Sequence, residues 1–149
     1  MKDGIGKQNY AKVGEYYGYW LNGERHGEGV MTYLNKDVYS GNWADGKKDG
    51  QGTYIFFKTG EKYVGTFKKG QLTTGKWLYP NGSFFEGNFG HNQPKGAGSW
   101  SMANGNVVTG TYSQTTRADV EGNDIKLAWR TTCDITAWAW LCLFSIPFP

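Results

Sequence analysis

The chain has 149 residues, of which 23 are glycine and 4 are proline, and 17% of its residues are aromatic. This composition excludes collagen and flexible linkers, and the length allows one ordinary domain. The net charge of +3 is too small to indicate a nucleic-acid partner. No apolar stretch of signal-peptide type opens the chain, and Cys133 and Cys142 are too few for a disulfide framework. We therefore expect reduced thiols and a cytoplasmic location.

Residues 1–15 contain Gly4 and Gly6 followed by Tyr10, a pattern that looks like the second strand of a β-hairpin. The first strand of that hairpin is missing. A partial repeat in a fragment, a shortened form of the protein and an N-terminal cap all explain this segment equally well.

Residues 16–112 contain an internal repeat. Five segments share an aromatic-x-Gly-x-aromatic pattern, with Val replacing the first ring in the last: Tyr16-Gly18-Trp20, Tyr39-Gly41-Trp43, Tyr63-Gly65-Phe67, Phe85-Gly87-Phe89 and Val108-Gly110-Tyr112. Their central glycines lie 23, 24, 22 and 23 residues apart. A second pair of glycines follows at a fixed offset, with Thr73 as the exception: Gly27-x-Gly29, Gly50-x-Gly52, Thr73-x-Gly75 and Gly96-x-Gly98. Such spacing predicts a tandem-repeat architecture.

Each repeat is predicted to be a β-hairpin. The aromatic segments alternate with period two, which is typical of strands, and the second glycine pair begins another alternating segment. Turn sequences such as Asn22-Gly23, Asp45-Gly46 and Lys69-Gly70 separate the two strands. We therefore predict an all-β fold: an elongated, single-layer antiparallel sheet of tandem hairpins, with a repeat of about 23 residues.

The alternation also predicts the two faces of the sheet. Tyr16, Gly18 and Trp20 share one face, and Met31 and Tyr33 lie beside them across the hairpin. We expect each glycine to leave a hollow that receives an aromatic ring from an adjacent strand. Because an isolated hairpin is marginally stable in water, the repeats must stack to bury this face.

These residues resemble the MORN repeat, whose pattern is similar to Tyr-x-Gly-x-Trp-x-x-Gly-x-x-x-Gly-x-Gly. Residues 16–29 and 39–52 follow it closely, and the resemblance covers about residues 4–112. It implies an elongated twisted sheet that docks proteins and, in some members, acidic phospholipids.

A narrower likeness connects residues 37–43, 52–54, 59–67 and 92–98 to radial spoke head proteins of motile cilia and flagella. This likeness implies a structural scaffold in the axoneme, with other radial spoke head subunits as partners. The chain departs from those proteins at its apolar C-terminal end, where they carry a long acidic tail, and in having fewer N-terminal repeats.

The face opposite the rings is predicted to be mostly polar. Five apolar residues interrupt it in the middle repeats, namely Val30, Ile55, Phe57, Val64 and Leu78. A contiguous exposed apolar patch usually marks an interaction site, so these residues form the predicted protein-binding surface. Curvature of the strands that buries some of them is the alternative explanation.

The hairpin turns carry basic residues: Arg25, Lys47, Lys48, Lys68, Lys69 and Lys95. Stacking of the repeats would align them along one edge of the sheet. This row supports an alternative function, a peripheral membrane module that binds acidic phospholipids. A solvated row that keeps the sheet soluble is the simpler explanation.

No catalytic, cofactor or metal site is predicted. The two histidines, His26 and His91, lie at non-equivalent positions of the repeat, and no Ser/His/Asp order or metal-ligand spacing is present. Gly70 to Lys76 resembles a phosphate-binding loop, but Trp77 follows where a Ser or Thr would bind magnesium. We therefore expect a protein that is not an enzyme.

After Tyr112 the repeat stops. Residues 113–136 are predicted to form an irregular linker, and residues 137–149 an apolar tail without charges. The tail is shorter than the ~20 residues that span a bilayer, so we expect a cap over the last hairpin or a disordered end.

Overall fold

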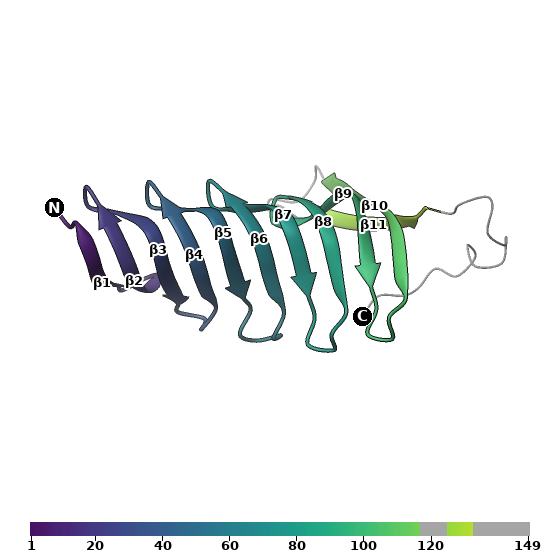
Figure 1. The fold of residues 1–149 in the computed structure, drawn as a ribbon, viewed down its shortest axis with the longest axis horizontal. Helices are drawn as coiled ribbons and strands as arrows, with labels where there is room; N and C mark the ends of the chain where they lie inside the picture. The colour runs from purple at the N-terminus through teal and green to yellow at the C-terminus, as the bar shows by residue number, and fades with distance from the viewer. Residues whose placement is uncertain (117–124, 133–149) are drawn as a thin grey trace.

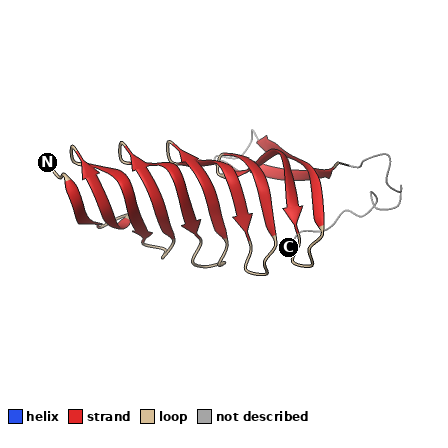
Figure 2. Ribbon diagram, viewed as in Figure 1, coloured by secondary structure: helices blue, strands red, loops and turns tan. Residues whose placement is uncertain are grey.

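The computed structural model describes residues 1–116 and 125–132, and these ranges contain strands and turns but no helix (Figure 2). Eleven strands form one open antiparallel sheet, in which each strand pairs with its neighbours in the sequence (Figure 1). The predicted fold class is confirmed. The strands are β1 Gly4–Tyr10, β2 Gly14–Leu21, β3 Glu24–Tyr33, β4 Val38–Ala44, β5 Lys47–Ile55, β6 Lys62–Lys68, β7 Gln71–Leu78, β8 Phe84–Gly90, β9 Gln93–Ser101, β10 Val107–Thr116 and β11 Ile125–Thr131.

Two kinds of turn connect the strands from β2 to β10. The hairpins β2–β3, β4–β5, β6–β7 and β8–β9 close with two residues whose φ angles lie between 49° and 93°. Positive φ at both residues is the type I′ geometry, whose twist matches that of the strands. The hairpins are joined by longer loops, residues 33–37, 56–61, 79–83 and 102–106. In each loop the first backbone N–H donates to the last carbonyl, at 2.8–3.0 Å.

A continuous column of glycines crosses the sheet. From β1 to β10, each of these glycines pairs with a glycine on the neighbouring strand, and Gly110 pairs with Thr131 on β11. The column consists of Gly6, Gly18, Gly29, Gly41, Gly52, Gly65, Gly75, Gly87, Gly98 and Gly110. Gly6 places β1 in the same register as the repeats.

Several of these glycines are needed because aromatic rings lie over them, whereas Gly65 and Gly75 are closest to the backbone of the neighbouring strand. A Cβ added to Gly29 would lie 2.5 Å from Cζ of Tyr16, and one added to Gly98 would lie 2.5 Å from Cε2 of Phe85. Tyr16 and Phe85 therefore have no exposed surface, although the sheet has only one layer. The expected packing of rings into glycine hollows is present in these repeats.

Ring contacts connect one repeat to the next. Tyr16 packs edge-to-face against Trp20 at 5.2 Å and against Trp43, in the following repeat, at 5.3 Å between ring centroids. The indole N–H of Trp43 donates to the carbonyl of Gly29 at 3.1 Å, and Trp20 makes the same bond to Gly6. Such geometry stabilises aromatic pairs by about 0.5–1.5 kcal/mol beyond the area they bury. The core is thus a ribbon of rings along one face.

The hairpin β6–β7 differs from the others. In β2–β3, Gly18 pairs with Gly29 and Trp20 with Arg25, so β3 carries two extra residues. The hairpins β4–β5 and β8–β9 have the same irregularity. In each of the three hairpins the irregular segment contains a glycine at positive φ, namely Gly27, Gly50 and Gly96. In β6–β7 only Thr73 is extra, and its backbone is not left-handed. Thr replaces Gly there because the bulge is one residue shorter.

The unequal repeat lengths follow from these differences. The shorter bulge at Thr73 accounts for the interval of 22 residues between Gly65 and Gly87. The loop 56–61 has one more residue than the other loops between hairpins, which accounts for the interval of 24. The register of the glycine column is the same in every repeat.

The prediction of an irregular segment from residue 113 is corrected. Strand β10 continues to Thr116, and Ile125–Thr131 forms an eleventh strand that pairs with it. The ring of Trp129 lies 4.8 Å from that of Tyr112 and occupies the hollow over Gly110, so β11 extends the ring face. The repeat pattern could not show this strand because β11 contains no glycine. The apolar tail 137–149 and both cysteines lie outside the described residues.

Candidate docking surfaces

The face opposite the rings, here called the polar face, contains a hollow of about 640 Å³ that follows the glycine column over β1–β6. Gly18, Gly29, Gly41 and Gly52 form its floor. Two rows of outward-pointing side chains border it: Tyr17, Val30, Ser40, Thr53 and Val64 on one side, and Ile5, Tyr19, Glu28, Asn42 and Gln51 on the other. The floor of the hollow is backbone and its walls are the two rows of side chains, because a Cβ on these glycines would point to the ring face.

The N-terminal end of this hollow is apolar and exposed. Ile5, Tyr17 and Tyr19 expose 60%, 57% and 48% of their surface, and Val30 and Val64 are also exposed. The middle of the hollow offers hydroxyl and amide groups, including those of Ser40 and Gln51. Large apolar side chains gathered around a hollow are typical of protein-binding surfaces.

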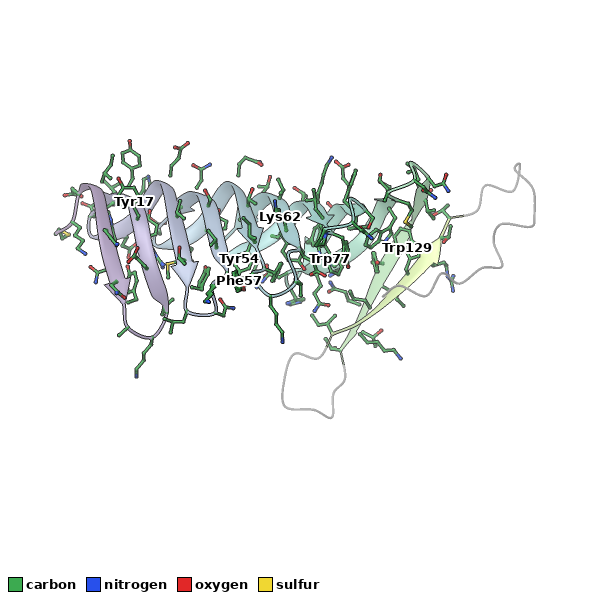
Figure 3. All side chains as sticks on the ribbon, turned by 90° about the horizontal axis from the view of Figure 1, so that it is seen from below. Tyr17, Tyr54, Phe57, Lys62, Trp77 and Trp129 are labelled. Atoms are coloured by element: carbon green, nitrogen blue, oxygen red, sulfur yellow. The ribbon has the colours of Figure 1, made fainter. Side chains whose placement is uncertain are left out.

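The five residues of the predicted protein-binding surface do not form one patch but lie in three separate positions. Val30 and Val64 border the polar-face hollow. Ile55 and Leu78 lie in the next row of the same face, half-buried, with Lys62 between them in the register. Phe57 follows the end of β5 and contacts Lys36, whose Nζ lies 5.1 Å from its ring centroid. Figure 3 shows Phe57 near Tyr54 and far from Tyr17.

The sequence prediction missed Ile5, Tyr17 and Tyr19. The alternation that defined the ring face also places Tyr17 and Tyr19 on the polar face, between Tyr16, Gly18 and Trp20. The prediction included Val30 from the same hairpin, but it counted no tyrosine as an apolar interruption of the polar face. Their proximity to Ile5 depends on the pairing of β1 with β2, where Ile5 lies opposite Tyr19.

The basic residues of the hairpin turns do not form a single row. Lys47, Lys68, Lys69 and Lys95 are exposed, as expected for the turn edge. Arg25 and Lys48 instead lie on the ring face, which corrects their assignment to the turns. The guanidinium of Arg25 lies 4.5 Å from the ring centroid of Trp43, and Nη2 donates to the carbonyl of Gly46.

Metal-ligand clusters and membrane-spanning helices are two further kinds of site to consider in the described residues. They contain no group of three or more His, Cys, Asp or Glu residues placed to hold a metal ion. No helix among them is long and apolar enough to span a bilayer. His91 lies exposed in the β8–β9 turn, and half-buried His26 belongs to β3.

Comparison with known protein families agrees with this geometry. A family model of the MORN repeat matches residues 16–38, 39–58 and 85–107. The chain contains MORN repeats. The matched segments hold three hairpins with the longer bulge, whereas the unmatched residues 59–84 include the hairpin with Thr73. No curated protein matched the chain. MORN repeats indicate a protein-binding or membrane-binding module.

Proposed function

We propose that this chain is a non-catalytic scaffold that docks a partner protein in the polar-face hollow. The observation that carries the proposal is the cluster of exposed apolar residues, Ile5, Tyr17, Tyr19 and Val30, around the N-terminal part of the hollow. Burying apolar surface releases about 25 cal/mol for each Å². Tyrosine is also among the residues enriched where proteins bind one another.

The sheet suits such a role because its hydrogen-bonded register holds the binding residues in place. Tyr17 and Val30 face each other directly on β2 and β3, and Tyr19 faces Ile5 on β1. A surface that is already ordered loses little conformational entropy on binding. The partner can therefore bind without reorganising the repeats.

The setting that we propose is the radial spoke head of motile cilia or flagella, with other spoke head subunits as partners. The support is the likeness of residues 37–43 and 59–67 to radial spoke head proteins. An axonemal, cytoplasmic location follows from this proposal. Co-purification with axonemal proteins that persists at high salt is the expected result.

Binding to acidic phospholipids is the second candidate, because Lys47, Lys68 and Lys69 are exposed at the hairpin turns. Each basic residue near an anionic membrane contributes about 1 kcal/mol. The attraction is screened by salt, so vesicle binding that falls steeply with ionic strength would favour this function.

Paired substitutions distinguish the two functions. Tyr17→Thr with Val30→Thr removes the apolar surface of the polar face without placing like charges opposite each other, and Lys47→Glu with Lys69→Glu changes the turn edge. Because all four side chains are exposed, both variants should keep the melting temperature of the wild type. Affinity purification followed by mass spectrometry should show that only the first variant loses its protein partner. Loss of localisation in the lysine variant alone would establish the lipid function instead.

A further inference from the structure

The ring face contains a second, smaller hollow of about 180 Å³, on the opposite side of the sheet from the polar-face hollow. It is lined by Lys48, Tyr54, Phe56, Tyr63, Phe67 and Asn92. These residues come from β5, β6, the loop after β5 and the β8–β9 turn. Small-molecule sites usually measure about 300–1,000 Å³, so this hollow has room for a single side chain.

An ammonium group surrounded by rings stands in this hollow. Nζ of Lys48 lies 4.8 Å from the ring centroid of Tyr54, 5.4 Å from that of Tyr39 and 5.5 Å from that of Phe67. The ion pairs among the described residues, Lys7 with Glu15 and Lys76 with Glu86, do not include Lys48. Burial, together with the nearby Arg25, lowers the pKa of Lys48. An anion would relieve this cost of burial.

The residues that occupy the position of Lys48 in the other hairpins show that the fold does not need a positive charge there. Arg25, Leu72 and Pro94 occupy the position of Lys48 in the other hairpins, each paired with the second aromatic residue of its repeat. Leu72 and Pro94 are fully buried, so an apolar side chain satisfies the fold there. Arg25 donates to the carbonyl of Gly46, whereas no such bond is made by Lys48 within the described residues.

The hydroxyl groups of the hollow already have partners. The hydroxyl of Tyr54 donates to Asp37, and that of Tyr63 donates to the carbonyl of Asn92. Oδ1 of Asn92 accepts the backbone N–H of Leu72, which leaves the amide nitrogen of Asn92 as a second donor. The hollow thus offers cationic and amide donors within aromatic walls.

We infer that this hollow binds one acidic side chain of a partner polypeptide, whose carboxylate contacts Nζ of Lys48. An apolar residue beside that carboxylate would pack on Phe56 and Tyr54. A lipid phosphate carries the same charge, but Lys48 is recessed among rings, and a bilayer surface reaches exposed lysines such as Lys47 more easily. This site does not depend on docking in the polar-face hollow.

A random peptide library selected on the whole chain tests the inference. The peptides recovered should share an acidic residue beside an apolar one, and replacing that residue with its amide should weaken binding about tenfold. Lys48→Met should weaken binding by a similar factor, whereas the matched control Lys47→Met should leave it unchanged. Because Leu72 is tolerated at the equivalent position, Lys48→Met should fold, and its melting curve confirms this.

Nuclear magnetic resonance of the lysine side chains locates the contact. Addition of a selected peptide should shift the signals of Lys48, and the amide-containing peptide should not. Recovery of no peptide, of peptides without an acidic residue, or of peptides that bind Lys48→Met equally well would overturn the inference. It would also be overturned if the Lys48 signals responded only to vesicles of phosphatidylcholine with phosphatidylserine.

Discussion

At the scale of single residues, this protein depends on glycines that leave space for rings. Gly41 illustrates the constraint, because an added Cβ would lie 2.5 Å from the carbonyl oxygen of Gln51 and 2.9 Å from the hydroxyl of Tyr39. That hydroxyl already donates to the carbonyl of Asn42 at 3.0 Å, so the ring is held in place. Neither the backbone nor the ring can move away cheaply.

Gly41→Val should therefore destabilise the fold by about 1–3 kcal/mol, as overpacking of a core does. Ser40 is the matched control, because it is the preceding residue and is exposed on the polar face. Ser40→Val should change the free energy of unfolding by no more than about half a kcal/mol. Denaturant unfolding measures both variants, and equal losses would show that the two faces are wrongly assigned.

Buried tyrosines predict how stability depends on pH. Burial raises the pKa of Tyr16 from 10.0 to about 12, and desolvation also raises the pKa of Tyr39, Tyr54 and Tyr63. Above pH 10 the unfolded chain loses phenolic protons that the folded chain keeps, so stability should fall as the pH rises from 10 to 12. The lowered pKa of Lys48 makes stability rise with pH. Lys48 is a single group, however, whereas several tyrosines have a raised pKa.

Thermal unfolding followed by circular dichroism should show a falling melting temperature over this pH range. The melting temperature of the Tyr16→Phe variant should fall less steeply with pH than that of the wild type, because one titrating group is removed. Titration of every tyrosine near pH 10 without loss of strand signal would contradict the buried positions.

At the scale of the hairpin, the bulge explains the second glycine pair of the repeat. Gly96 has a φ of 78° and nothing within 4 Å of an added Cβ, so only its backbone conformation requires glycine. Gly50 adds a steric cost, since its Cβ would lie 3.1 Å from that of Asn42. Thr73 escapes both requirements because its bulge is shorter.

Gly96→Ala should lower the free energy of unfolding by about 1–2 kcal/mol, because a residue with a side chain is strained in a left-handed backbone conformation. Gly50→Ala should cost more, and the exposed control Ala97→Thr should cost no more than about half a kcal/mol. Urea midpoints of the three variants test this order. A Gly96→Ala variant as stable as the wild type would show that the bulge is not left-handed in solution.

The hairpins, their turns and the ring face could all be predicted from the sequence, because each follows from local alternation and from turn residues such as Asn22 and Gly23. The two-residue turns pair Trp20 with Arg25 and Trp43 with Lys48. These two basic residues were assigned to the turns because the prediction began the second strand of each hairpin only at its second glycine pair. Strand β11 was missed because it has ring residues without the glycine that marks a repeat. The N-terminal end of the polar-face hollow depends on β1 pairing with β2, which places Ile5 opposite Tyr19. The glycine pattern of residues 1–15 indicated the strand, but the prediction did not extend the polar face to it.

At the scale of the whole molecule, the sheet is an elongated ribbon with the larger hollow on its polar face and the smaller one on its ring face (Figure 1). The rings are packed together on the ring face, and Figure 3 shows Trp77 and Trp129 along it, away from Tyr17. The polar-face hollow crosses six strands, so a partner bound there contacts several repeats at once. This arrangement suits a scaffold that holds an extended segment of another protein.

Site-specific photocrosslinking from position 17 tests the docking function most directly. A photoreactive phenylalanine analogue in place of Tyr17 keeps the ring and its exposure, and it reacts only with groups in contact. In ciliated cells we predict a cross-link to a single protein partner, and no such product from the same analogue at Lys69. Adducts at position 69 alone, or adducts of position 17 with lipid in place of protein, would contradict the account.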